Sequence, residues 1–264
     1  MNGYQRFAFV CALLMTSLLG AENVTEGLSA VQLLEQARGM FPHERIEIDG
    51  TLTVAEERGL NTIARPYTLT LDWNGTDPKA VCTLFLEKGS TTVVQRATLT
   101  RRGNEKSMVT LMNDKGESVS NVRFNTPVGE SDVTWMDLSL DYLWWKNARF
   151  LTEAEVRAGD TADHSLGFRC GSRNCLVIEV QPPDPIPGCK AVWLWIDESS
   201  GYMVQAAQIG SSGSLQRKMW IQRVGREEGR WVPREFRVKT SAQRRQTSLY
   251  VRNVRSESFQ SEAE

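Results

Sequence analysis

The chain has 264 residues, 41% of them hydrophobic and 24% charged, and its 31 basic residues nearly balance 32 acidic ones. A net charge of −1 gives no field strong enough to attract nucleic acid or an anionic membrane surface, so neither partner is expected. The length suits one large all-β domain or two smaller ones.

The N-terminal 21 residues resemble a secretory signal peptide. Arg6 supplies the positive charge, residues 7–19 form an apolar run, and the small residues Gly20 and Ala21 precede a polar segment. The run is shorter than the roughly 20 residues that a bilayer-spanning helix needs. We expect cleavage near Ala21; an uncleaved anchor is the alternative, because Leu19 occupies a position where a small residue is usual.

The first helical pattern of the mature chain begins at Ser29, which forms a capping box with Gln32, and ends before the Phe41-Pro42 break. Alternation of apolar and polar residues then predicts strands. These runs cover residues 46–54, 67–73, 81–87, 92–101, 107–112, 119–124, 165–170, 175–181, 190–196, 202–209, 216–224, 231–239 and 247–254.

A second helix is predicted over residues 134–145, where Thr134 can cap and apolar residues recur at spacings of three and four. We expect Asp137 and Asp141 to form a solvated stripe. The two remaining sides of this helix are apolar, which suits a movable lid over a partly unfilled apolar cavity. One side carries Trp135, Leu138, Tyr142 and Trp145, and the other carries Met136, Leu140 and Leu143.

Strands and helices do not alternate regularly, so a doubly wound parallel sheet is disfavoured. The pattern predicts a mainly β, α+β fold in which one long, strongly curved antiparallel sheet forms an incomplete β-barrel with covering helices. We expect a single domain over residues 22–254 and a solvated C-terminal tail over residues 255–264.

Cys170 and Cys175 flank a polar loop and are a candidate disulfide across a hairpin, given export to an oxidising compartment. Free buried thiols remain the alternative. A metal site is disfavoured because neither His43 nor His164 lies in a ligand-pair spacing. The chain also lacks a Gly-x-Ser-x-Gly elbow and phosphate-binding glycine loops, so we predict no metal, no cofactor and no enzymatic activity.

Two segments carry a resemblance to a known family. Residues 131–138, Ser-Asp-Val-Thr-Trp-Met-Asp-Leu, and residues 192–197, Val-Trp-Leu-Trp-Ile-Asp, are similar to segments of bacterial outer-membrane lipoprotein-sorting proteins, the LolA-like family. Membership implies a monomeric periplasmic half-barrel that holds acyl chains, with an inner-membrane transporter and an outer-membrane acceptor as possible partners. It also implies an arginine inside the barrel that holds a lid shut, for which Arg45 and Arg65 are candidates.

The predicted function is therefore a carrier of lipoprotein acyl chains or phospholipid. The alternative is a non-enzymatic assembly subunit of a cell-envelope complex that uses the curved sheet as a protein-docking groove. The apolar residues predicted to line the lipid cavity are Ile46, Ile48, Leu52, Val54, Leu69, Leu71, Trp73, Trp135, Leu138, Tyr142, Trp145, Val192 and Leu194.

Overall fold

The computed structural model describes residues 27–40, 45–56, 62–72, 79–100, 108–159, 166–227, 230–241 and 245–256. The signal segment over residues 1–21, both histidines and Trp73 lie outside these ranges. Within them, no helix has the length and apolar character that crossing a membrane requires.

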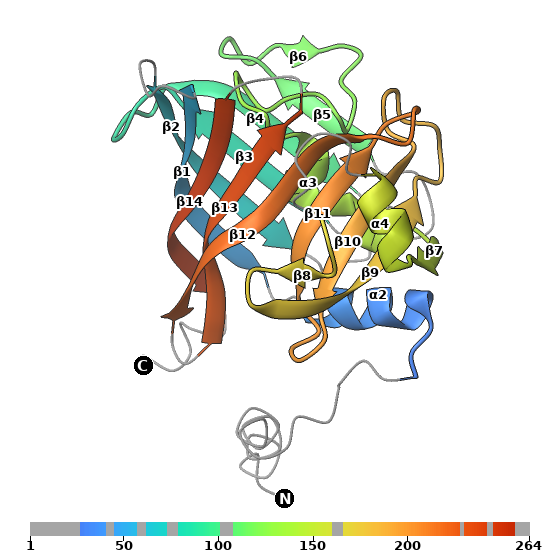
Figure 1. Cartoon of the computed structure of the whole chain (residues 1–264). Helices are drawn as coiled ribbons and strands as arrows, with labels where there is room; N and C mark the ends of the chain where they lie inside the picture. The colour runs from blue at the N-terminus through green and yellow to red at the C-terminus, as the bar shows by residue number, and fades with distance from the viewer. Residues whose placement is uncertain are drawn as a thin grey trace, which may run out of the picture.

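One antiparallel sheet of fourteen strands dominates the fold (Figure 1). Its path runs β6-β5-β4-β3-β2-β1-β14-β13-β12-β11-β10-β9-β7, with β8 paired to β9 beside this path. The strands are β1 (Ile46–Glu56), β2 (Thr62–Asp72), β3 (Lys79–Phe85), β4 (Val93–Thr100), β5 (Met108–Met112), β6 (Ser118–Val119), β7 (Asn147–Phe150), β8 (Arg169–Cys170), β9 (Arg173–Gln181), β10 (Ala191–Asp197), β11 (Met203–Ile209), β12 (Leu215–Glu227), β13 (Arg230–Thr240) and β14 (Arg245–Ser256). The sheet curves strongly but does not close, which confirms the predicted incomplete barrel.

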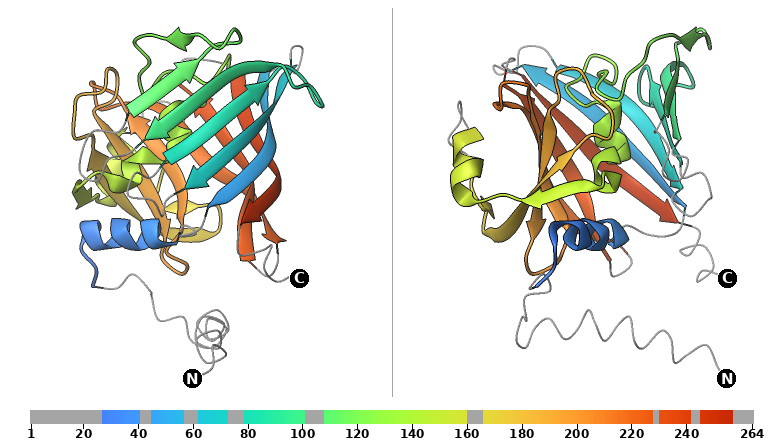
Figure 2. Two further views of the ribbon diagram at one scale, coloured as in Figure 1. Left: turned by 180° about the vertical axis from the view of Figure 1, so that it is seen from behind. Right: turned by 90° about the vertical axis from the view of Figure 1, so that its right-hand side faces the viewer.

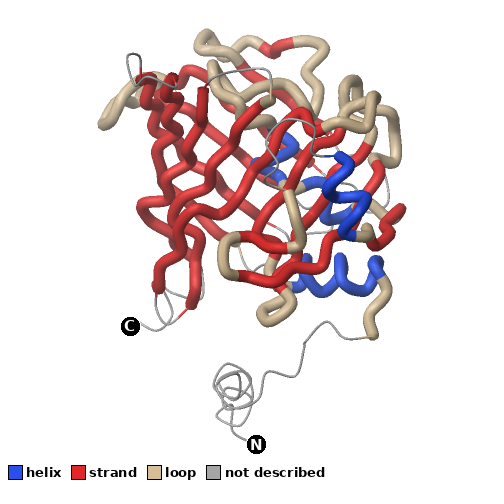
Figure 3. The backbone as a smooth tube through the Cα atoms, viewed as in Figure 1, coloured by secondary structure: helices blue, strands red, loops and turns tan. Residues whose placement is uncertain are grey.

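The helical elements are short and lie at different places on this sheet. In the described ranges they are α2 (Ala30–Gly39), α3 (Trp135–Ser139), the 3-10 turn η2 (Asp141–Trp144) and α4 (Glu153–Gly159). In the side view of Figure 2, α3 lies between the two halves of the curved sheet, α4 lies outside, and α2 runs across one end. The same separation of helices and strands is visible in Figure 3.

The sheet buries apolar side chains on both faces of its C-terminal half. In β10, Val192 and Leu194 belong to the large cluster on the concave face, whereas Trp193 and Trp195 belong to a second cluster beneath α4. The indole nitrogens of these two tryptophans donate to the Glu179 carboxylate and to the carbonyl oxygen of Gly167, at 3.0 and 2.7 Å. Because both faces of β10 are covered, its sequence is a continuous apolar run rather than an alternation of apolar and polar residues.

Several local predictions are confirmed and others are wrong. The capping box of α2 forms as predicted, since the Ser29 hydroxyl accepts from the Gln32 N–H and the Gln32 side chain accepts from the Ser29 N–H. The strand predicted over residues 119–124 is much shorter, since only β6 at its beginning is paired. Strand β14 extends through Arg255 and Ser256, which the sequence analysis places in the tail. The tail prediction failed there because cross-strand pairing with β1 orders two residues that carry no apolar signal.

Strand β7 and helix α4 were not predicted. The start of α4 nevertheless carries a legible signal, because Thr152 and Glu155 form a capping box in which each side chain satisfies the other's backbone N–H. These backbone and side-chain hydrogen bonds to Thr152, together with the guanidinium of Arg149, lower the pKa of Glu155 to about 2. A Thr-x-x-Glu pattern was therefore present in the sequence.

The four cysteines of the described residues are free thiols, so the predicted disulfide between Cys170 and Cys175 is not formed. The two residues do lie at the β8–β9 hairpin. The interaction between the two thiols lowers the pKa of Cys175 and raises the pKa of Cys170. The hairpin geometry was predicted correctly, and the covalent bond was not.

Gly50 provides a test of the sheet geometry. A Cβ atom there would collide with the backbone oxygen of Tyr250 and the ring of Tyr67, so we expect Gly50→Ala to lower the free energy of unfolding by about 1–3 kcal/mol. Denaturant unfolding measures the change. Gly39→Ala is the control, because a Cβ atom there meets open space; equal stability of the two variants would contradict the strand register at Gly50.

Candidate functional site

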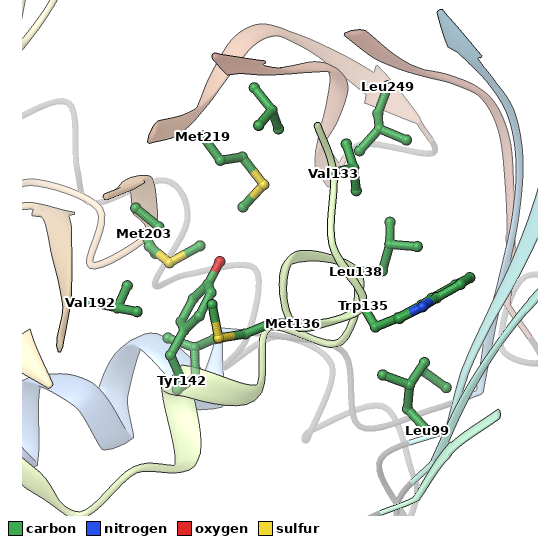
Figure 4. Close-up of a cluster of buried hydrophobic side chains, with 14 of the residues drawn as sticks. Leu99, Val133, Trp135, Met136, Leu138, Tyr142, Val192, Met203, Met219 and Leu249 are labelled. Carbon is green, nitrogen blue, oxygen red and sulfur yellow. The ribbon is translucent and has the colours of Figure 1, made fainter. Parts of the chain in front are cut away.

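The space enclosed by the curved sheet is occupied by residues 131–145, which we call the lid segment. Figure 4 shows Trp135 pointing toward the N-terminal strands, with Leu99 of β4 nearby, while Met136 and Tyr142 point toward Met203 and its neighbours on the C-terminal strands. All three lid side chains are buried. Side chains of the lid segment therefore contact both opposite walls of the half-barrel, but Tyr142 lies with Met136 and not, as the helical spacing predicted, with Trp135.

Polar contacts fix the beginning of the lid segment to β14. Thr247 accepts a hydrogen bond from the Asp132 N–H at 3.0 Å, and its hydroxyl donates to the Asp132 carboxylate at 3.1 Å. Arg245 Nε donates to the same carboxylate at 3.1 Å. Asp132 and Thr247 are buried, so these bonds form where water cannot substitute for them.

A buried ion pair joins the lid segment to β12. Arg217 Nη1 lies 2.8 Å from Asp137 Oδ2, and Nη2 donates to Oδ1 at 3.1 Å, with side-chain exposures of only 8% and 5%. Arg217 also donates to the carbonyl oxygen of Asp132 and to the side chain of Gln208. Asp137 in turn accepts from the N–H and hydroxyl of Thr134, which caps α3. We call Arg217, Arg245 and Thr247, with Asp132 and Asp137, the latch.

The latch corrects two expectations. Asp137 and Asp141 are not a solvated stripe: both are buried, and Asp141 accepts from the indole N–H of Trp145 at 2.9 Å. Arg45 and Arg65 are not latch residues, because Arg45 pairs with Glu47 on the surface and Arg65 donates to a backbone carbonyl of residue 86. The sequence does contain a signal for Arg217. It lies two residues before Met219 in the same strand, so both side chains point to the same, buried face of the sheet.

The lid helix breaks at Leu140. The predicted continuous helix over residues 134–145 is instead α3 followed by η2, and Leu140 between them has φ 51° in the left-handed region. That conformation costs a non-glycine residue roughly 1–2 kcal/mol. The break lets Met136 and Tyr142 face the same wall while Trp135 faces the other (Figure 4), a geometry that one straight helix of this length would not give.

Little space is left between the lid segment and the C-terminal strands. Among the described residues, the cavity between the lid segment and the C-terminal strands has a volume of about 10 Å³, and its lining includes Met136, Tyr142 and Arg217. Such a volume holds about one water molecule. At this place the apolar side chains of the lid segment occupy the space that the sequence analysis expected to be partly unfilled.

Tyr142 brings an unusual polar group into this apolar region. Its hydroxyl is buried and has no hydrogen-bond partner among the described residues. Burial raises the pKa of Tyr142 well above its ordinary value, and the nearby Asp137 carboxylate raises it further, against the opposing charge of Arg217. The tyrosine therefore remains a neutral hydrogen-bond donor beside the ion pair.

The structure brings the described lipid-cavity candidates together on the concave face, in or against one apolar cluster. Trp73 lies outside the described residues. Their role in lipid binding stays a prediction; the residues in this cluster are Ile46, Ile48, Leu52, Val54, Leu69, Leu71, Trp135, Leu138, Tyr142, Trp145, Val192 and Leu194. In the part of the chain that the structure describes, no three His, Cys, Asp or Glu side chains gather into a metal-binding group.

The fold is similar to that of many solved structures, of which three are described here. The first is a domain described as an outer-membrane lipoprotein-sorting protein from Vibrio parahaemolyticus, with TM-score 0.68 and 10% identity over 86% of this chain and 92% of that one. A DUF1329 family protein from Desulfovibrio piger has TM-score 0.66 and 12% identity over 86% and 92%. A LolA superfamily protein from Nitrosomonas europaea has TM-score 0.64 and 12% identity over 87% and 94%.

Sequence comparison adds one family assignment. No curated protein matches the chain. A family model described as "Uncharacterized protein" matches residues 118–263, which is more than half of the chain and includes the lid segment and every strand from β6 to β14. The chain therefore belongs to the family of this model, and its fold is the LolA-like fold of outer-membrane lipoprotein-sorting proteins.

Proposed function

We propose that this protein is a non-enzymatic periplasmic carrier that binds the acyl chains of lipoproteins, or phospholipid, on the concave face of the half-barrel. The LolA-like fold supports a carrier in general. The signal-like segment over residues 1–21 supports export, and the proposal includes cleavage near Ala21 and a monomeric mature protein. An inner-membrane transporter would deliver the cargo and an outer-membrane acceptor would receive it.

The observation that carries the proposal is the apolar lid segment inside the sheet. An acyl chain and the lid segment are alternative occupants of the same space, since both present hydrocarbon to the concave cluster. Burying about a dozen methylenes contributes roughly 10 kcal/mol at about 0.8 kcal/mol each. Exposing several large lid side chains costs a comparable amount, at about 1.5–3 kcal/mol each. Because the free energy gained by burying the acyl chain and the free energy lost by exposing the lid side chains are nearly equal, the carrier could release its cargo.

The lid segment has features of a part that can move. It is fixed by a small number of polar contacts in the latch, and the left-handed backbone at Leu140 is destabilised relative to a glycine at the same position. Opening would separate Asp137 from Arg217 and expose both groups to water, which offsets much of the lost interaction. The latch thus sets how readily the concave face becomes accessible.

A second candidate function is a non-enzymatic binding or assembly subunit of an envelope complex. One specific observation favours it: the enclosed space holds a cavity of only about 10 Å³ in this conformation. If the lid stayed closed, only the outer surfaces of the sheet would be available to bind a partner. Lipid binding distinguishes the two candidates.

The strength of the latch is testable by a double-mutant cycle. We expect Arg217→Met and Asp137→Leu each to lower the free energy of unfolding by about 3 kcal/mol, because each leaves the other charge buried without its partner. The double variant is expected to lose less than the sum of the two. Denaturant unfolding measures all three, and additive losses would show that the pair does not hold the lid segment.

Lipid binding is testable with a milder change to the latch. Native mass spectrometry of the protein purified from its own envelope is expected to show bound acyl lipid. Thr247→Val keeps the side-chain shape but removes the hydroxyl that bonds Asp132, so uptake of a fluorescent fatty acid is expected to be severalfold faster. Thr53→Val, on the neighbouring strand and outside the latch, is the matched control with unchanged uptake.

Two results would count against the carrier. One is the absence of bound lipid in the native preparation together with no fatty-acid uptake by any variant, which favours the assembly subunit. The other is equal acceleration by Thr247→Val and Thr53→Val, because a general loosening of the sheet would then explain uptake without a lid.

A further inference from the structure

The sheet divides where β13 and β14 separate. These strands pair only from Glu235 opposite Tyr250 to Lys239 opposite Gln246. Beyond Tyr250, β14 continues to pair with β1, while the first part of β13 pairs with β12 on its other side. A cleft of about 660 Å³ lies at this place, lined by Thr51, Thr53, Arg223, Val224, Arg234, Tyr250, Val251 and Arg252. Figure 1 shows the three C-terminal strands side by side there.

Irregularities in the strands place two arginines at this cleft. The β1–β14 register passes from Asp49 opposite Asn253 to Gly50 opposite Val251, so Arg252 is the extra residue of a β-bulge. Arg223 on β12 lies between two further register shifts. Bulges redirect side chains and are frequent beside binding sites. Both arginines are exposed to solvent.

A third arginine reaches the cleft from β13 because a glycine leaves room for it. A Cβ atom on Gly225 would lie 2.9 Å from Arg234 Cγ and 3.0 Å from its Nε. The side chain of Arg234 thus lies over Gly225, and its Nη1 donates to the backbone oxygen of Arg252 at 3.0 Å. Three different strands therefore supply guanidinium groups to one cleft.

Two carboxylates on the strands around the cleft, Glu235 and Asp49, have cationic partners. Glu235 is almost fully buried and accepts from both Arg223 and Arg237 at 2.8 Å. Asp49 lies 2.8 Å from Arg255 of β14. Among the described residues that line the cleft, three are arginines and none is acidic. Since like charges at close range are unfavourable, an anion placed between them would be stabilised.

We propose that this cleft is a binding site for an anionic phosphate group, either free or in a lipid headgroup. A guanidinium presents a planar fork of donors that fits phosphate oxygens in pairs, and groups from several strands can surround one tetrahedral anion. The volume suits a small headgroup and falls within the range of ordinary ligand sites. The site is separate from the concave cluster, so it does not depend on the carrier proposal.

Calorimetric titration of the mature protein tests the site. The probes are inorganic phosphate and dihexanoyl phosphatidylglycerol, a soluble lipid with one anionic phosphodiester, and sodium acetate is the control anion. We expect phosphate-bearing probes to bind more tightly than acetate and less tightly as salt is raised. The double variant Arg234→Gln with Arg252→Gln is expected to bind them at least tenfold more weakly. Arg255→Gln, which removes one positive charge from β14 outside the cleft lining, is expected to bind them as the unaltered protein does.

The outcomes separate the sources of phosphate. Binding of the lipid without binding of inorganic phosphate identifies a headgroup as the ligand, whereas comparable binding of both identifies the phosphate anion itself. The proposal is overturned if neither probe binds, if acetate binds as well as phosphate, or if the Arg255→Gln variant loses as much affinity as the double variant. Unchanged thermal unfolding of the variants shows that lost binding is not lost folding.

Discussion

The buried contact between Arg217 and Asp137 is the constraint on which the rest of the closed structure depends. Removing two charges from water is expensive, and the cost is offset only when the pair is well aligned and its remaining hydrogen bonds are satisfied. Here the alignment is bidentate, Thr134 supplies further donors to the carboxylate, and Gln208 accepts from the guanidinium. The pair therefore adds little net stability, and its main effect is to specify where the lid segment docks.

The ion pair is important for docking because the other contacts of the lid segment are mostly apolar and do not depend strongly on orientation. Trp135 and Leu138 pack on one wall and Met136 and Tyr142 on the other, and apolar packing of this kind tolerates sliding and substitution. A purely hydrocarbon plug could settle in several ways. The charged and hydroxyl partners on β12 and β14 select one of them, which is the use of buried ion pairs that is best supported in other systems.

The sequence determines the architecture more clearly than the site. Alternating runs such as Leu69 and Leu71 predict the curved sheet because side-chain period and burial are local properties. Arg217 could not be matched to Asp137 in the same way, since the two are 80 residues apart and nothing local distinguishes an arginine that faces the core. The break at Leu140 was also invisible, because leucine normally favours a helix and only tertiary packing stabilises its left-handed backbone.

A filled interior and a carrier function are compatible for a physical reason. An empty apolar cavity large enough for an acyl chain would lose dispersion contacts on every wall and destabilise the unloaded protein. A lid segment with apolar side chains toward both walls avoids that loss by occupying the space itself. In the proposed carrier, the polar latch would make this occupation reversible, and hydrocarbon would compete with the lid segment rather than enter a vacancy. The affinity for lipid would then be a difference between two nearly equal burials, to which the hydrogen bonds at Asp132 and Asp137 contribute directly.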